Sequence, residues 1–177
     1  MIFNPENAVI LVIDVQEKLL RASFNKETLL KKAQTVVSAA SILEIPIFVT
    51  EQYPQGLGES VDGIKENAKV YIKTDFNALA DKSLLNDLKN TGRTQIIVFG
   101  IETHICVHQT VDALLKEGFE VVTVADACGS RSEYEYKMGL SAMEKNGAGI
   151  KTTEMILFEL IKTAKHQNFK EIQALIK

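Results

Sequence analysis

Three residues whose side chains can take part in hydrolysis lie far apart in the sequence: Asp14, Lys73 and Cys106. A cysteine thiol attacks a carbonyl carbon at neutral pH when a base takes its proton and a positive charge lies nearby. Asp14 is suited to take that proton and to deliver it later to a leaving nitrogen or oxygen. The ammonium of Lys73 would favour both the carboxylate and the thiolate. The three residue types therefore fit a cysteine hydrolase with a thioester-type intermediate.

Each of these residues also has an ordinary structural interpretation. Cysteine is among the most buried residue types and is usually inert packing. Asp14 fits a cap at the end of a strand, and Lys73 fits a solvated lysine in a loop. The surroundings of Cys106 favour reactivity, because Thr103 or His104 can cap a helix that would place this cysteine in its first turn. Unpaired N–H groups and the helix dipole there favour a thiolate over a thiol.

The chain alternates between short apolar runs and amphipathic segments. The apolar runs predict buried parallel strands, and the amphipathic segments predict helices. Six strands alternating with helices predict a parallel sheet covered on both faces, which is a Rossmann-like, three-layer αβα sandwich. The predicted strands are 8–13, 45–50, 70–72, 96–99, 119–125 and 150–152, and the predicted helices are 26–43, 81–90, 103–117, 130–146, 154–164 and 169–176.

This architecture would bring the three reactive residues together. Asp14 and Lys73 each end a predicted strand, and Cys106 follows another. Parallel sheets bind ligands beyond the carboxyl ends of their strands, where the strand order reverses. The third strand is expected two positions from the first, about 10 Å away, and a lysine side chain can cover much of that distance.

Composition sets limits on location and partners. The 177 residues predict a single domain, 1–177. A net charge of −3 without a Lys/Arg cluster predicts no nucleic-acid partner and no membrane partner. Cys106 and Cys128 are the only cysteines and cannot form a disulfide framework, which favours the cytoplasm. The N-terminal apolar run is interrupted by Asp14 and begins without a basic segment, so we expect neither a signal peptide nor a membrane span.

Four segments give the chain its family resemblance. They are VIDVQ around Asp14, Lys73 with the Asn77-Ala78-Leu79 that follows it, GIETHICV around Cys106, and VADACGSRS after the fifth predicted strand. With these, the chain resembles the isochorismatase-like cysteine hydrolases nearly from end to end. TEQYPQGLG and NFKEIQALIK resemble the isochorismatase domain-containing branch most closely.

The resemblance implies an Asp–Lys–Cys catalytic triad, carried by Asp14, Lys73 and Cys106. It also implies a cis peptide between Ile101 and Glu102. The backbone N–H groups of Glu102 and Cys106 would then form an oxyanion hole for the substrate oxygen.

The sequence departs from the nicotinamidases of the same superfamily. Their Asp-x-His metal site is replaced here by Glu51-Gln52-Tyr53, so the imidazole ligands for Zn²⁺ or Fe²⁺ are missing. We therefore predict no metal and no cofactor, and nicotinamide is disfavoured as a substrate. The residues that flank the triad in sequence are candidates for the wall of a substrate pocket: Gln16, Tyr53, Phe76 and Ile105.

The leading functional hypothesis is a metal-independent hydrolase that cleaves a C–N bond in a small amide or carbamoyl compound. The alternative is a catalytically idle family member that acts as an interaction or assembly module. A homo-oligomer is expected, because the C-terminal helices carry more apolar residues than an edge helix needs. Those residues are Ile156, Leu157, Leu160, Ile161, Ile172, Leu175 and Ile176.

Overall fold

The strands form a single parallel sheet that runs through the molecule. The computed structural model describes residues 2–177. Within that range the sheet has six strands in the order β3-β2-β1-β4-β5-β6. This confirms the predicted α/β architecture. The strands are β1 (Ala8–Ile13), β2 (Ile47–Gln52), β3 (Ala68–Lys73), β4 (Gln95–Gly100), β5 (Glu120–Val124) and β6 (Gly149–Lys151).

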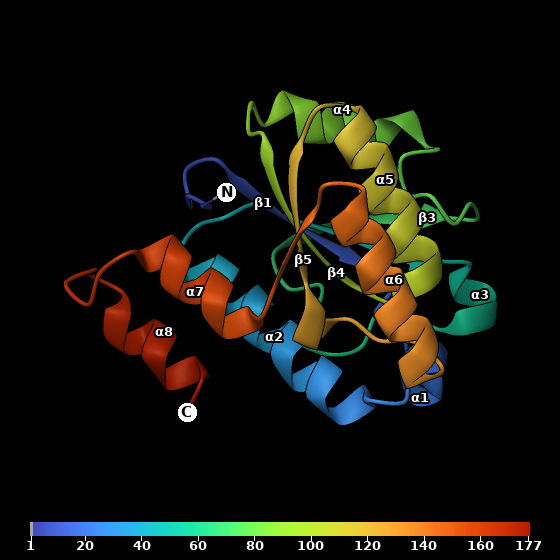
Figure 1. Cartoon of the computed structure of the whole chain (residues 1–177), viewed down its shortest axis with the longest axis horizontal. Coiled ribbons are helices and arrows are strands. Elements are labelled where there is room, and N and C mark those ends of the chain that lie inside the picture. The colour runs from blue at the N-terminus through green and yellow to red at the C-terminus, as the bar shows by residue number, and fades with distance from the viewer. Residues whose placement is uncertain (1) are drawn as a thin grey trace.

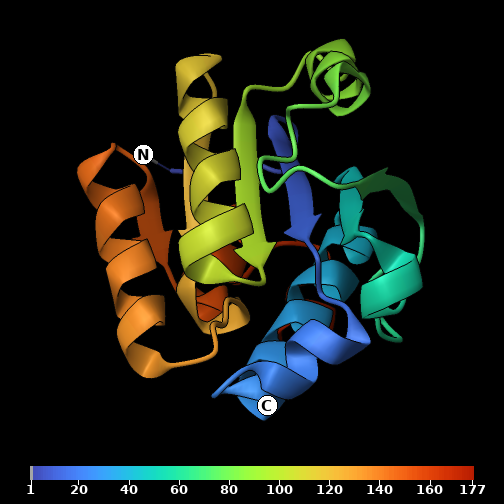
Figure 2. The same ribbon diagram turned by 90° about the vertical axis from the view of Figure 1, so that its right-hand side faces the viewer.

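Helices cover both faces of the sheet (Figures 1 and 2). On one face lie α4 (Lys82–Asn90), α5 (His108–Lys116) and α6 (Glu133–Lys145). On the other, α2 (Lys26–Ile42) contacts both α7 (Thr153–Ile161) and α8 (Phe169–Leu175). The remaining elements are the short helices α1 (Glu17–Ala22) and α3 (Pro54–Leu57), the π-helical turn η1 (Thr103–Val107) and the 3₁₀ turn η2 (Ala125–Ala127). No helix within residues 2–177 is long and apolar enough to cross a bilayer.

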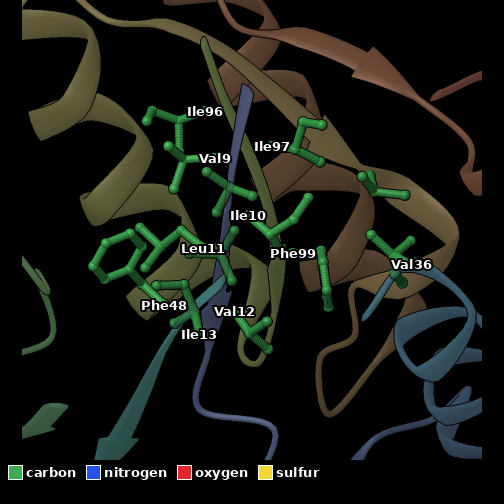
Figure 3. Packing of buried hydrophobic residues seen from close by; sticks show 14 of the residues in the cluster. Val9, Ile10, Leu11, Val12, Ile13, Val36, Phe48, Ile96, Ile97 and Phe99 are labelled. Carbon is green, nitrogen blue, oxygen red and sulfur yellow. The ribbon is translucent and has the colours of Figure 1, made fainter. Parts of the chain in front are cut away.

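The central strand β1 is buried along its whole length. Its side chains alternate between the two faces, with Val9 and Leu11 on one side and Ile10 and Val12 on the other (Figure 3). Val12 lies on the same side as Val36 of α2. Burial on both faces explains why this strand reads as a continuous apolar run and not as an alternating one.

The strand order reverses between β1 and β4. Both strands are hydrogen-bonded neighbours in parallel register, and the pairing ends at Ile13 opposite Gly100. Gly100 has a φ of 137°, and a Cβ there would lie 1.9 Å from the carbonyl oxygen of Ile13. Only glycine allows the two backbones to approach so closely and then diverge. The divergence opens the carboxyl edge of the sheet at the point where a ligand site is expected.

Among the differences from the sequence predictions, three lie next to the predicted triad. A helix, α1, follows β1 where no element was predicted. β2 extends to Gln52, two residues beyond the predicted end at residue 50. The helix expected over 103–117 is divided into the π-helical turn η1 and the α-helix α5.

The apolar C-terminal residues proved to be internal packing. Ile172 of α8 forms a buried cluster with Leu157 and Ile161 of α7 and with Ala39 of α2. Ile156 and Leu160 belong to the main core, and Leu175 and Ile176 are partly buried against the smaller cluster. The reasoning that linked these residues to oligomerisation was therefore wrong, because these side chains are already buried or partly buried within the chain.

Candidate active site

Cys106 lies in the π-helical turn η1, between β4 and α5. Thr103 begins this turn, and both its N–H and its hydroxyl donate to the carbonyl of Gly129, at 2.9 Å each. The expected capping by Thr103 or His104 was wrong, since Glu102 occupies the cap position and no side chain caps the turn. The peptide bond between Ile101 and Glu102 is cis. The turn places Cys106 at the carboxyl edge of the sheet with 7% of its surface exposed.

Asp14 follows β1 directly and is completely buried. Its φ is +50°, a conformation that few residues other than glycine adopt without support from their neighbours. The support comes from β2, because the Asp14 N–H donates to the carbonyl of Thr50 at 3.1 Å. The hydroxyl of Thr50 also donates to Asp14 Oδ1 at 2.7 Å. Asp14 is therefore fixed through both its backbone and its side chain.

Lys73 ends β3, two strands away from β1, and its side chain spans that distance. Its Nζ lies 2.7 Å from Asp14 Oδ2, and both side chains are buried. Its donors are directed elsewhere, however: Gln52 Oε1 lies at 2.5 Å, and the carbonyls of Asp75 and Phe76 lie at 3.1 and 3.4 Å. Asp14 Oδ2 consequently accepts no well-oriented hydrogen bond from the described part of the chain. The ammonium therefore stabilises the carboxylate chiefly by its charge.

The thiol of Cys106 is within hydrogen-bonding reach of both partners. Its pKa is raised to about 12, first by burial and then by the charge of Asp14, while Lys73 opposes the rise in part. The expectation of a preformed thiolate was therefore wrong. The helix-start argument treated the turn as exposed, whereas burial next to a carboxylate favours the neutral thiol.

Both cysteines make the folded protein less stable in alkali. Burial also raises the pKa of Cys128 to about 12, from an ordinary value near 9.0. An unfolded chain then loses thiol protons near pH 9 while the folded chain keeps them. Stability thus falls as pH rises from 9 towards 12, by about 1.4 kcal/mol per pH unit for each cysteine. Urea unfolding at pH 8 and 10.5 should show a smaller loss in Cys128→Ala than in the unaltered protein. An equal loss in both would contradict this origin.

The four predicted pocket residues differ in how far they are buried. Gln16 is fully buried, and its amide bonds to the backbone of Gln52 and Gly58. Its assignment to a pocket wall was wrong, because the side chain anchors the loop after β2. Ile105 is partly buried against the core. Tyr53 and Phe76 are 54% and 53% exposed. Both lie beside the lysine, since the Tyr53 N–H donates to the carbonyl of Lys73 and the Phe76 carbonyl accepts from its Nζ.

The position of the nicotinamidase metal site has a structural role here. Glu51 is buried and accepts from the N–H of Ser60 at 2.8 Å, with Lys65 Nζ 3.9 Å away. His104 Nδ1 is 3.0 Å from the hydroxyl of Ser130. Within residues 2–177 no three His, Cys, Asp or Glu side chains are grouped as metal ligands.

Two residues that contact the triad were missed in the sequence. Thr50 and Gln52 lie at alternate positions of β2, so their side chains point to the same face. β2 lies between β1 and β3, and the two side chains reach Asp14 on one side and Lys73 on the other. The sequence did place both residues at the end of a strand. Their contacts with Asp14 and Lys73 can be inferred only once the neighbouring strands are known.

Comparison with known proteins gives one consistent family. Residues 8–155 match the family model of the isochorismatase domain. "Isochorismatase domain-containing protein 2" of Danio rerio is 39% identical over 175 residues, which cover 98% of this chain and 88% of that protein.

Solved structures agree with this assignment. The MAR1 ribonuclease of Caenorhabditis elegans is 36% identical with a TM-score of 0.93, covering 99% of this chain and 92% of that one. The Escherichia coli YcaC gene product, described as an octameric hydrolase of unknown specificity, is 22% identical with a TM-score of 0.90. The latter covers 99% of this chain and 95% of its own, and at that identity it supports the fold alone. The chain belongs to the isochorismatase-like hydrolase family.

Proposed function

We propose that this protein is a cysteine hydrolase that cleaves a C–N bond in a small amide or carbamoyl compound without a metal. The observation that carries the proposal is the buried pair of Asp14 Oδ2 and Lys73 Nζ, 2.7 Å apart, beside the thiol of Cys106. An isolated buried charge pair is a weak stabilising feature, because removing both charges from water costs free energy. Because the pair lies beside the thiol of Cys106, which keeps some exposure to solvent, it can take part in a reaction of that thiol.

The first half of the proposed reaction forms a thioester. Cys106 Sγ attacks the carbonyl carbon while its proton passes to Asp14 Oδ2. The negative charge that develops on the substrate oxygen is stabilised by the N–H groups of Glu102 and Cys106. The C–N bond then breaks, and Asp14 returns the proton to the leaving nitrogen. The products of this half are an amine or ammonia and an acyl group on Cys106.

The second half regenerates the enzyme. Water attacks the thioester while Asp14 takes one of its protons, and the C–S bond breaks as that proton returns to Sγ. One amide and one water become one acid and one amine. Lys73 keeps its charge throughout and favours the anionic forms of its neighbours.

The surroundings of the site favour a small substrate. The triad is almost completely buried, so a large planar ring system would have to displace packed side chains. Tyr53 and Phe76 are exposed aromatic side chains from the two loops that contact Lys73. We propose that they line the entrance for the substrate.

We also propose a cytoplasmic location and a homo-oligomer. Both cysteines are free in the structure, as expected for a reducing compartment. Ile2, Met155 and Phe158 are apolar and exposed, and they line one shallow groove. A second copy of the chain could cover such a surface.

A turnover assay distinguishes this proposal from the alternative of a catalytically idle module. The purified chain is incubated with primary amides, ureides and carbamoyl compounds, and ammonia release is measured, with RNA cleavage measured in parallel because of the nematode relative. The proposal expects ammonia release from a small member of the panel and none of the RNA cleaved. Absence of ammonia from the whole panel, or RNA cleavage as the sole activity, would contradict it.

A further inference from the structure

We infer that Thr50 and Gln52, neither of which touches the reacting atoms, are positioning residues that direct Asp14 Oδ2 towards the thiol as the acceptor of its proton. This inference rests on the proposed function and deepens it. It assigns to β2 a task in the active site although this strand supplies no member of the triad.

Thr50 determines which carboxylate oxygen is available. Its hydroxyl donates to Asp14 Oδ1 at 2.7 Å, and both residues are completely buried. The backbone contact between the same residues fixes Asp14 in its unusual conformation. With Oδ1 occupied, the side chain cannot exchange its two oxygens without breaking a buried hydrogen bond to a charged group. Oδ2 therefore remains towards Lys73 and Cys106.

Gln52 determines where the protons of Lys73 point. An ammonium has three N–H donors. Gln52 Oε1 and the carbonyls of Asp75 and Phe76 provide three acceptors, so Asp14 Oδ2 receives charge stabilisation without a directed hydrogen bond. Gln52 is itself held in place, because its Nε2 donates to the carbonyl of Thr74 and its N–H donates to Gln16 Oε1.

Among the described residues, two ionisable groups face Asp14: Lys73 from β3 and Cys106 from η1. Glu51 lies between the two positioning residues but points to the opposite face of β2, where it bonds to Ser60. A change at Thr50 should act on Asp14 directly, and a change at Gln52 should act on it through Lys73.

The two residues should shift the acid dependence of the site in opposite directions. Thr50→Val removes a hydrogen bond that stabilises the carboxylate, so protonation of Asp14 becomes easier. Gln52→Met frees one N–H of Lys73, whose nearest remaining acceptor is Asp14 Oδ2 at 2.7 Å, so protonation becomes harder. Hydrogen bonds to charged groups are strong enough to move the midpoint of a pH–rate profile by about one pH unit.

Alkylation of Cys106 by iodoacetamide provides the test. The rate is followed by peptide mass spectrometry from pH 3.5 to pH 8, and the midpoint of its acidic limb is compared among variants. We expect that midpoint to move up in Thr50→Val, to move down in Gln52→Met, and to stay in place in Thr50→Ser, which keeps the hydroxyl. Thr123→Val is the matched control, because Thr123 is equally buried on β5 and its hydroxyl donates to Met143 Sδ, away from Asp14.

An unmoved midpoint in both Thr50→Val and Gln52→Met, or a shift of Thr123→Val as large as theirs, would overturn the inference. If Thr50→Val fails to fold, as judged by its melting curve, the downward shift in Gln52→Met decides alone. Asp14→Asn separates this inference from the proposed function. A midpoint at the same pH in Asp14→Asn refutes Asp14 as the proton acceptor. A midpoint that is lost in Asp14→Asn, so that the rate rises steadily with pH, but that is unchanged by Thr50→Val and Gln52→Met refutes only the positioning role.

Discussion

Cys106→Ala is expected to reduce amide turnover by about 10³-fold or more, because no other group in the site can form the covalent intermediate. The folded state should change little, since only one buried sulfur is lost and the Asp14–Lys73 pair stays intact. Urea unfolding should place the variant within about 1 kcal/mol of the unaltered protein. Loss of turnover without loss of stability would separate a chemical role from a packing role.

Cys128→Ala is the matched control for this change. Cys128 is also buried and its thiol pKa is also raised to about 12, but it lies outside the triad. Its replacement should leave turnover close to that of the unaltered protein. Equal losses of turnover in the two variants would contradict a nucleophilic role for Cys106.

Lys73→Met is expected to destabilise the protein by about 3–5 kcal/mol, because it leaves the buried carboxylate of Asp14 without its counter-charge. Turnover should fall as well, since the positive field beside Cys106 disappears. Urea unfolding at pH 7 measures the first effect. Asp14→Asn combined with Lys73→Met carries neither charge and should recover much of the lost stability, so the two changes should be strongly non-additive.

Lys69→Met on the same strand is the control. Lys69 is exposed and pairs with Asp87 on the surface, so its loss should hardly change stability. A Lys73→Met variant as stable as Lys69→Met would contradict the pairing of Lys73 with Asp14. Additive effects of the Asp14 and Lys73 changes would contradict it as well.

The sheet could be predicted because its signal is local. Runs such as 8–13 are apolar without alternation, which is how a strand buried on both faces must read. Because parallel strands have their carboxyl ends at the same edge of the sheet, Asp14, Lys73 and Cys106 share that edge. The structure agrees with the expected separation of Lys73 from β1 by one intervening strand.

Three features of the site depend on contacts that the sequence does not display. The π-helical turn around Cys106 is a choice of backbone hydrogen-bond register, and the residue types from Thr103 to Val107 are compatible with an ordinary helix. The raised pKa of Cys106 arises from burial against Asp14, so it depends on tertiary structure. The roles of Thr50 and Gln52 require knowledge of both neighbours of β2.

The apolar C-terminal helices illustrate the same limit. An amphipathic pattern shows that a helix face will be covered, but it does not say by what. Here that face packs within the chain, against Ala39 of α2 and against the main core. Met155 and Phe158 on α7 remain exposed.

The most direct test of the central claim is the pH dependence of Cys106 alkylation by iodoacetamide in the unaltered protein and in Asp14→Asn. If Asp14 accepts the thiol proton, the rate in the unaltered protein should be nearly independent of pH below neutrality, down to the acidic limb. In Asp14→Asn the proton must leave to solvent, so the rate should rise about tenfold per pH unit over the same range. Indistinguishable profiles in the two proteins would contradict the assignment of Asp14 as the base.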